Sequence, residues 1–193
     1  MSLLNAGAAP RERPGAYLPA ATFDPQPTLV SDLVTLGPLR SNDWDALFGV
    51  VSDPEIWTQH PEADRRRQCI FRGFFVQALA EGALAIVENS TGEIIGSTRF
   101  HAGADPSEIE IGWTFLARRC WDGRDNAQVK RLVLGHAFRE FGRVVFIVGP
   151  ENFRSQAAVA RLGARPDGEI TEPDREGRPA RRLRFVITRP AAM

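Results

Sequence analysis

A single stretch, from Glu108 to Lys130, constrains the fold of this chain more than any other. Apolar and β-branched side chains dominate positions 109–116, a short loop rich in Arg, Asp and Gly follows, and a helical pattern begins at Asn126. This order predicts a strand, a turn and the start of a helix. The first turn of a helix has N–H groups without intrahelical partners and the positive end of the helix dipole. The junction therefore has the features of a phosphate site, although many such junctions are only connections.

Alternating strand and helix patterns surround this stretch. The apolar periodicity predicts strands at 33–36, 84–88, 93–100, 108–116, 144–148 and 182–188, and helices at 43–51, 64–80, 126–141 and 152–162. Residues 165–181 are polar and rich in Pro and Gly, so we expect a loop or a ragged hairpin there. The order of elements predicts an α/β (α+β) fold, with one mixed sheet and helices on both of its faces.

The N-terminal segment differs from the rest of the chain. Residues 1–28 contain several prolines and show neither a helical nor a strand period, so we expect an extended or disordered arm before a single domain at 29–193. The arm either remains unpacked or packs along the domain, or along a second subunit, through Tyr17, Leu18 and Phe23.

Composition excludes several classes of function. Acidic and basic residues are equal in number, which argues against a general nucleic-acid binder; binding through the Arg-rich segment 175–184 is a disfavoured third hypothesis. Cys69 and Cys120 lie far apart and lack zinc-type spacing, so we expect two free thiols and no metal. No apolar run is long enough to cross a bilayer, and the first residues do not resemble a signal peptide. We therefore expect a cytoplasmic protein, a monomer or homodimer, without a membrane or nucleic-acid partner.

Several motifs of the chain, taken together, resemble the GNAT acyltransferases, and within them the branch of the RimJ and RimL N-acetyltransferases. They are Gly-Trp-Thr-Phe-Leu-Ala-Arg-Arg at 112–119, the loop 121–126, Lys130-Arg-Leu, His136-Ala-Phe, and Val148-Gly-Pro-Glu-Asn-Phe-Arg-Ser155. The resemblance spans residues 33–163. It implies that strands 108–116 and 144–148 splay apart, and that acetyl-CoA enters between them as cosubstrate. It also implies direct acetyl transfer to a primary amine, either a protein N-terminus or a small amine.

The same resemblance implies a set of cofactor-binding residues. The pantetheine arm would pair with the backbone near Phe115, Leu116 and Ala117, and Asn152 would bond to the same arm. The loop and the helix start would hold the phosphates. The residues implied there are Arg118, Gly123, Arg124, Asn126, Ala127 and Lys130. Lys130 falls in the first turn of the expected helix, so it either reaches a phosphate or extends along the surface as a snorkelling lysine.

Catalysis by direct transfer needs a base for the amine and an acid for the departing thiolate. Glu110 is the first candidate for the base and Glu108 the second, because they share one face of the strand; either can instead be a solvated carboxylate. The resemblance gives Ser155 the role of the acid, and a bond to a backbone carbonyl is its alternative. By the same resemblance, Trp57 and His60 contact the substrate unless they only pack.

One departure from the family pattern motivates a rival hypothesis. Relatives have glycine and an aromatic residue where this chain has Asp122 and Asp125, so two carboxylates stand in the expected diphosphate loop. Nearby arginines provide compensating charge, namely Arg118, Arg119 and Arg124. The rival hypothesis is a GNAT-fold domain that has lost catalysis and serves as a binding or assembly module.

Overall fold

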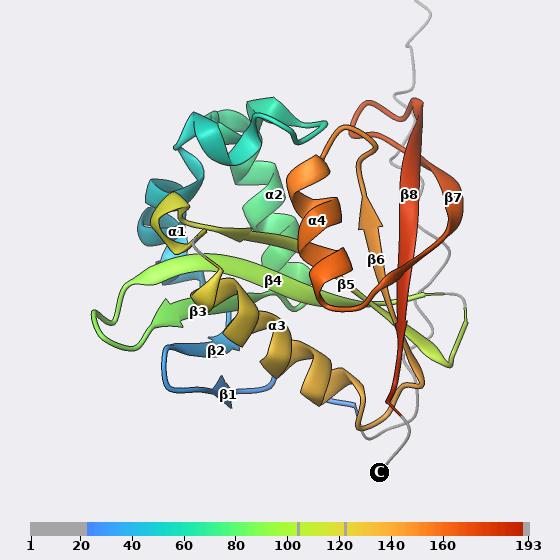
Figure 1. Cartoon of the computed structure of the whole chain (residues 1–193). Coiled ribbons are helices and arrows are strands. Elements are labelled where there is room, and N and C mark those ends of the chain that lie inside the picture. Colours follow the sequence, from blue (N-terminus) through green and yellow to red (C-terminus); the bar gives the residue numbers. More distant parts are fainter. Residues whose placement is uncertain (1–22, 104, 122, 191–193) are drawn as a thin grey trace, which may run out of the picture.

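An eight-stranded sheet organises the part of the chain that the computed structural model describes, which is residues 23–103, 105–121 and 123–190 (Figure 1). Its strands lie in the order β1-β2-β3-β4-β5-β6-β8-β7, and all neighbours are antiparallel except β5 and β6. The strands are β1 (Leu29–Val30), β2 (Val34–Pro38), β3 (Leu84–Glu88), β4 (Ile94–Ala102), β5 (Glu108–Leu116), β6 (Arg143–Val148), β7 (Arg165–Pro173) and β8 (Pro179–Thr188). The predicted mixed α/β fold with a GNAT-like sheet is confirmed.

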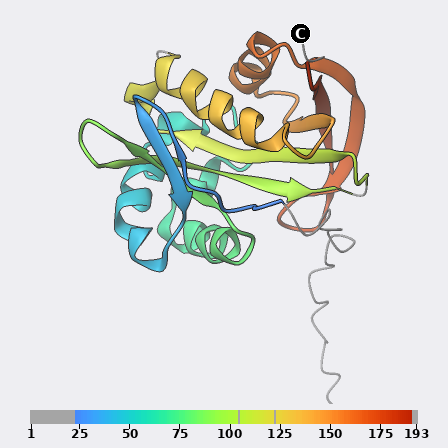
Figure 2. The same cartoon turned by 90° about the horizontal axis from the view of Figure 1, so that it is seen from below.

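Helices cover both faces of this sheet. Figure 2 shows α3 and α4 on one face and α1 and α2 on the other. The α-helices are α1 (Trp44–Val51), α2 (Gln68–Ala80), α3 (Arg124–Ala137) and α4 (Phe153–Arg161), and short 3-10 turns are η1 (Ser41–Asp43), η2 (Pro54–Trp57), η3 (Ala63–Arg66) and η4 (Arg118–Cys120). Each helix packs its apolar side against the sheet, because burial of apolar side chains away from water is favourable.

Two apolar clusters correspond to these two faces. One packs α3 against the strands, with Val129, Val133 and Ala137 of the helix fully or nearly fully buried. The other joins α1, α2 and η2 to the opposite face, where Phe71 and Phe75 of α2 are buried beside Trp57. Phe115 of β5 belongs to this second cluster, so the central strand is packed on both sides.

The parallel strands β5 and β6 are paired along only a short part of their length. Their ladder joins Glu108, Ile109 and Glu110 to residues 143–145 and then stops. Beyond that point β5 stays paired with β4, while β6 stays paired with β8 up to Val148. Figure 1 shows the two strands running in clearly different directions. The predicted splay of the two central strands is therefore present, and it opens the sheet in its middle.

Charged side chains join the two strands at the end where they are still paired. Glu108 is 9% exposed and forms ion pairs with Arg143, at 2.8 Å, and with Arg184 of β8. Both arginines also pair with Asp167 of β7. The cluster thus ties four strands together next to the point where the sheet opens.

A bulge in β5 accompanies the opening. Between the pairs Ser97↔Phe115 and Arg99↔Gly112, β5 contains one residue more than β4. Trp113 there has φ 52°, a value that is rare for a residue with a side chain. The Arg99 guanidinium stacks 3.6 Å from the centre of the Trp113 ring, and this cation–π contact helps to hold the side chain of the strained residue in place.

Of the two alternatives for residues 165–181, the ragged hairpin is confirmed: they form most of the hairpin β7–β8, whose register shifts between Pro166 and Glu169. Two expectations about helices need correction. The helix expected at 64–80 is broken at Arg67, whose ψ of 128° separates η3 from α2. The helix expected at 126–141 is α3, which begins two residues earlier and ends at Ala137.

The described part of the N-terminal arm packs on the domain. The Phe23 ring makes edge contacts with Phe100 and Phe141, and the carbonyl of Asp24 lies 2.7 Å from the His136 ring nitrogen Nε2. Tyr17 and Leu18, the other two residues of the packing alternative, lie outside the described residues.

The ion-pair cluster at Glu108 predicts a large effect on stability. We expect Glu108→Gln to lower the free energy of unfolding by about 3 kcal/mol, because it leaves Arg143 and Arg184 without their shared buried partner. Denaturant unfolding of the variant measures this loss. The matched control is Glu93→Gln, whose carboxylate pairs with Arg119 but is 68% exposed, and we expect a change below about 0.5 kcal/mol. Equal losses of unfolding free energy in the two variants would contradict a stabilising role of the ion-pair cluster at Glu108.

Candidate active site

Two adjoining cavities fill the opening between β5 and β6. The first, of about 200 Å³, is lined by residues 111 and 113–115 of β5 and by residues 146–148 of β6, and it extends to β7, β8 and the segment 60–65. The second, of about 160 Å³, lies toward the start of α3 and one side of α4. The cavities share part of their walls, and the shared residues are Trp57, His60, Thr114, Phe115, Lys130, Asn152, Ser155 and Val159. After the roles that the sequence resemblance implies, we call the first the acceptor cavity and the second the cofactor cavity, and we call this shared wall the junction.

The cofactor cavity has the features that an anionic ligand requires. Gly123 lies in its wall with φ 101°, the left-handed conformation that favours glycine, and Asn126 follows in the first turn of α3. The N-terminal end of α3 therefore faces this cavity. Arg154 and Arg161 of α4 line the same cavity, and the Arg154 guanidinium stacks 3.9 Å from the centre of the Trp121 ring.

Part of the β5 backbone edge near the cavities is already bonded within the chain. The Trp121 indole N–H donates to the carbonyl of Leu116 at 3.0 Å, and the Ala117 N–H donates to the carbonyl of Ile95 at 2.7 Å. Phe115 and Leu116 line the cofactor cavity, whereas Ala117 does not. The pairing expected between the β5 backbone and a pantetheine arm can therefore involve only residues before Ala117.

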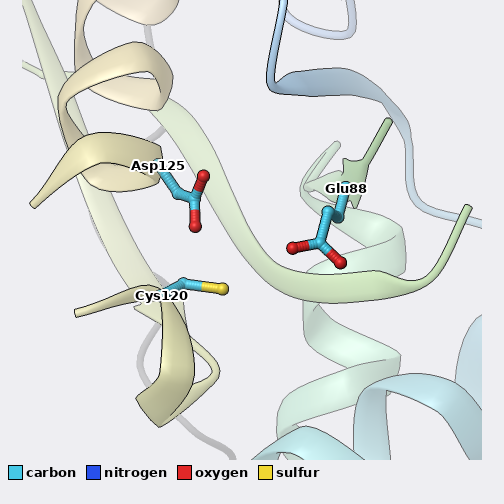
Figure 3. Close-up of side chains that lie close together, drawn as sticks. All are labelled: Glu88, Cys120 and Asp125. Atoms are coloured by element: carbon cyan, nitrogen blue, oxygen red, sulfur yellow. The ribbon is translucent and has the colours of Figure 1, made fainter. Parts of the chain in front are cut away.

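Asp125 does not face the cofactor cavity. Its carboxylate is directed toward the thiol of Cys120 and the carboxylate of Glu88, and the three groups lie within 4.8 Å of one another (Figure 3). Burial, followed by a hydrogen bond to Asp125, raises the pKa of Cys120 to about 11, so the thiol is protonated and donates to this carboxylate. Arg119 bonds Glu88 at 2.9 Å and adds a positive charge to the group. The charges of this cluster are therefore balanced within the protein, by the Arg119 guanidinium and the Cys120 proton. Asp122, the other acidic residue of the loop, lies outside the described residues.

The acceptor cavity is lined by charges of both signs. Glu110 of β5, Glu172 of β7 and Arg182 of β8 all contribute to its wall. The Glu110 carboxylate folds over Gly112, with Oε1 only 2.8 Å from the place where a Cβ would stand, so glycine leaves room for it. Arg175, in the turn between β7 and β8, forms a two-armed ion pair with Asp64 of η3 at 3.0 and 2.8 Å. This pair joins the two segments that line the outer part of the cavity.

His60 is uncharged in this environment. Burial, together with the positive charges of Arg65, Arg182 and Arg154, lowers the pKa of His60 to about 3. Its Nδ1 accepts the Glu62 N–H at 3.0 Å, so the single ring proton is on Nε2. His60 at the junction is therefore a hydrogen-bond donor through Nε2 and cannot act there as a base. Trp57 packs edge-on against it, and its own indole N–H donates to the Val51 carbonyl.

Lys130 is buried at the junction, with 6% exposure. Its Nζ donates to the Thr114 hydroxyl at 2.9 Å, and that hydroxyl in turn lies 2.8 Å from the hydroxyl of Thr98. Burial lowers the pKa of Lys130 to about 8. Lys130 is the seventh residue of α3, so the expectation that it lies in the first turn is wrong, and so is the alternative of a snorkelling surface lysine.

Asn152 and Ser155 stand together at the start of α4. The Asn152 side-chain oxygen accepts the Ser155 N–H at 3.1 Å and so caps the helix, which leaves the NH2 group of Asn152 as its donor toward a ligand. Both residues line both cavities. The helix cap therefore fixes the orientation of Asn152 and the position of the serine.

The structure brings together most of the predicted site residues. Those that line a cavity are Trp57, His60, Glu110, Phe115, Leu116, Gly123, Asn126, Lys130, Asn152 and Ser155. Those outside both cavities are Glu108, Ala117, Arg118, Arg124 and Ala127. Glu108 is held in the ion-pair cluster described above, so a contact with substrate, as substrate-binding residue or as the second candidate base, is not supported. Arg118 pairs with Asp53 at 3.2 Å, away from the cavities.

Sequence reasoning missed several residues of the walls. On the cofactor side they are Thr114, Trp121, Arg154 and Arg161, and on the acceptor side Arg65, Glu172 and Arg182. Arg154 and Arg161 are seven residues apart, two turns of a helix, so their common face was visible in the sequence. The acceptor side was not visible, because it is assembled from a loop and a hairpin that are distant in sequence.

The fold is that of a known family. The model of the acetyltransferase (GNAT) domain matches residues 34–165, and the chain belongs to this family. No curated protein matches the chain.

Solved structures give the same result for the fold. A GCN5-related N-acetyltransferase from Brucella melitensis is 20% identical, with a TM-score of 0.71, over 86% of this chain and 83% of that one. An acetyltransferase from Agrobacterium tumefaciens is 26% identical, with a TM-score of 0.63, over 84% and 95%. Mycobacterium smegmatis RimJ in complex with CoA-disulfide is 21% identical, with a TM-score of 0.63, over 86% and 87%. In the described residues, no helix has the length and apolar character needed to cross a membrane.

The buried charge of Lys130 predicts a pH-dependent stability difference. Below about pH 8 the lysine is charged in both the folded and the unfolded chain, and the folded chain bears the full cost of burial. That cost is about 3 kcal/mol, and the hydrogen bond to Thr114 offsets about 1 kcal/mol of it. We therefore expect Lys130→Met to stabilise the protein by about 2 kcal/mol near pH 7.

The stability advantage of Lys130→Met becomes smaller as pH rises. Between the folded pKa of about 8 and the unfolded value of 10.5, the unfolded chain binds more protons, so the wild-type protein gains stability and the advantage of the variant shrinks. Urea unfolding of both proteins at about pH 7 and about pH 10 measures this. A difference that is the same at both pH values would contradict the desolvation of Lys130.

Proposed function

We propose that the chain is an acetyl-CoA-dependent N-acetyltransferase that passes an acetyl group directly to a primary amine. One observation carries the proposal: two cavities of different chemical character meet between the diverging strands β5 and β6. Direct transfer needs the thioester and the amine to meet away from bulk water, and the junction is the place where both cavities give access to the same side chains.

The cofactor cavity fits coenzyme A. The start of α3 and the guanidinium groups of Arg154 and Arg161 suit its phosphates, as a helix N-terminus and arginine commonly do. The NH2 group of Asn152 and the β5 backbone before Ala117 suit the amides of the pantetheine arm. The carboxylate of Asp125, which faces Cys120, does not oppose the phosphates from within the cavity.

The acceptor cavity fits an amine that arrives protonated. Glu110 takes one proton from the ammonium group, which frees the nitrogen lone pair to attack the thioester carbon. As the C–N bond forms the C–S bond breaks, the Ser155 hydroxyl gives its proton to the departing thiolate, and the second proton of the nitrogen returns to the Ser155 oxygen. The acceptor is a protein N-terminus or a small amine, and the mixed charges of Glu172 and Arg182 suit a polar group beside that amine. A cytoplasmic location remains a prediction.

The rival hypothesis, a binding module without catalysis, rested on Asp122 and Asp125. Asp125 gives it little support, because its carboxylate is engaged with Cys120. Asp122 lies outside the described residues, so the hypothesis now depends on this residue alone.

Binding of the cosubstrate tests the proposal and its rival together. We expect acetyl-CoA and CoA to bind with micromolar or tighter affinity, roughly 8 kcal/mol, in isothermal titration. Asp122→Gly is the paired variant, since removal of a carboxylate from the loop should leave the affinity equal or tighter. No heat of binding at millimolar acetyl-CoA would reject the enzyme and favour the binding module.

Steady-state kinetics with a model primary amine test the two catalytic side chains. We expect Glu110→Gln and Ser155→Ala each to lower kcat by about 100-fold, while KM for acetyl-CoA changes little, because each acts on a proton in the transition state. The Glu110→Gln rate should recover partly at higher pH, where the amine arrives neutral. Ser52→Ala is the matched control, since this exposed serine bonds the Gly49 carbonyl outside both cavities. Unchanged kcat in Glu110→Gln would remove this base from the mechanism.

A further inference from the structure

Lys130 is the only lysine in the 193 residues of the chain. The other Lys-or-Arg positions are all arginine, including those at the surface, in the ion-pair cluster and in the cofactor cavity. Arginine stays charged under all physiological conditions, whereas an amine can lose its proton and become a nucleophile. The one side-chain amine of the protein is thus chemically distinct from every other cation in it.

The position of this amine is also distinct. Lys130 lines both cavities at the junction, and its Nζ is bonded to Thr114, which lines both as well. The proposed reaction brings a thioester and an amine together at this place. Within the described residues no carboxylate pairs with it, and its hydrogen bond to Thr114 uses only one of its N–H groups. The charged groups that share the acceptor cavity with it are Glu62, Arg65, Glu110, Glu172 and Arg182, with neutral His60 between.

We propose that Lys130 is a self-acetylation site: when acetyl-CoA is bound and no acceptor fills the cavity, the enzyme transfers the acetyl group to its own Nζ. This inference rests on the proposed function, because it needs acetyl-CoA in the cofactor cavity. It goes beyond that function, because the acceptor is part of the chain and the product is a modified enzyme.

The reaction is the ordinary transfer with a different amine. The lone pair of neutral Nζ attacks the thioester carbon, the C–N bond forms and the C–S bond breaks. The thiolate leaves as CoA after taking one proton, and the nitrogen becomes an amide with one N–H. The burial that lowers the pKa of Lys130 raises the neutral fraction of this amine well above that of an exposed lysine.

The modified side chain suits its surroundings better than the charged amine does. The remaining amide N–H still has the Thr114 hydroxyl as acceptor, and the buried charge is gone. The acetyl group projects into space that the acceptor cavity provides. The acetyl group then occupies the place where the acceptor amine would meet the thioester, and an amide does not pass its acetyl group on. The modified enzyme is therefore inactive, and the modification switches it off when acetyl-CoA is present without an acceptor.

Intact-mass spectrometry of the full-length protein tests this directly. The purified protein is incubated with acetyl-CoA near pH 8, and peptide mapping after cleavage at arginine locates the acetyl group. We expect one acetyl group on Lys130, a loss of activity that follows the same time course, and protection by a model primary amine. Acetylation of the terminal α-amine maps to a different peptide and is counted separately.

Two variants separate enzyme-directed acetylation from simple chemical reactivity. Lys130→Arg should gain no acetyl group on this helix. In the double variant K130R/R131K the lysine moves by one position to the exposed side of α3. We expect its acetylation to be at least about tenfold slower than that of Lys130, because an exposed amine has no bound thioester beside it. Equal rates at positions 130 and 131 would overturn the inference.

A final arm distinguishes failure of this inference from failure of the proposed function. Binding of acetyl-CoA is measured by titration in the same preparation, and turnover is measured with the model amine. If acetyl-CoA binds and the amine is acetylated while Lys130 stays unmodified, the inference is wrong and the proposed function stands. If acetyl-CoA does not bind, both are wrong.

Discussion

The separation of β5 from β6 is the constraint on which the rest of this structure depends. Each hydrogen-bonded pair of residues normally stabilises a sheet, yet here the ladder between β5 and β6 stops after Glu110 and Val145. The two strands can diverge because each keeps a partner on its other side, β4 for β5 and β8 for β6. The Glu108 ion pairs hold the paired end, and the bulge at Trp113 turns the open end away. The cavities occupy the space that results, so the residues that make the site functional also interrupt the sheet.

Burial at the junction has the same electrostatic effect on every amine or imidazole that enters it. It lowers the pKa of His60 to about 3 and that of Lys130 to about 8, and in both cases loss of hydration is the largest cause. An acceptor amine that comes to the same place undergoes the same loss, which favours the neutral form needed for attack. In the reaction that we propose, the site therefore promotes deprotonation of the acceptor before any single base acts. A carboxylate such as Glu110 then needs to provide only the destination of the proton.

The fold was predictable from the sequence because its signals are local. The apolar strand at 144–148, the helix capped by Asn152 and the strand-loop-helix at 108–130 each show their period within a few residues. Part of the cofactor side of the site follows from the same local signals, although Arg154 and Arg161 were missed. The acceptor side does not, since Arg65, Glu172 and Arg182 come from segments whose approach depends on the β7–β8 hairpin. Glu108 and Glu110 show most clearly what local signals cannot predict, because they are two residues apart on one face of the same strand. Arginines of other strands, Arg143 and Arg184, hold Glu108 in ion pairs, whereas Glu110 lines the acceptor cavity.

The distribution of arginines explains how an acidic loop is compatible with the proposed phosphate site. Arg118 pairs with Asp53, and Arg119 pairs with Glu88 and Glu93, so these two guanidinium groups balance carboxylates of the protein instead of a ligand. Asp125 is balanced in a different way, by the proton of the Cys120 thiol. Positive charge toward the cofactor cavity comes from the opposite wall, where Arg154 and Arg161 project from α4. Because Arg154 is also stacked on Trp121 and donates to the Ile56 carbonyl at 2.7 Å, its guanidinium is oriented before any ligand arrives. A preoriented cation loses little side-chain entropy on binding, which offsets the absence of the glycine and the aromatic residue in the loop.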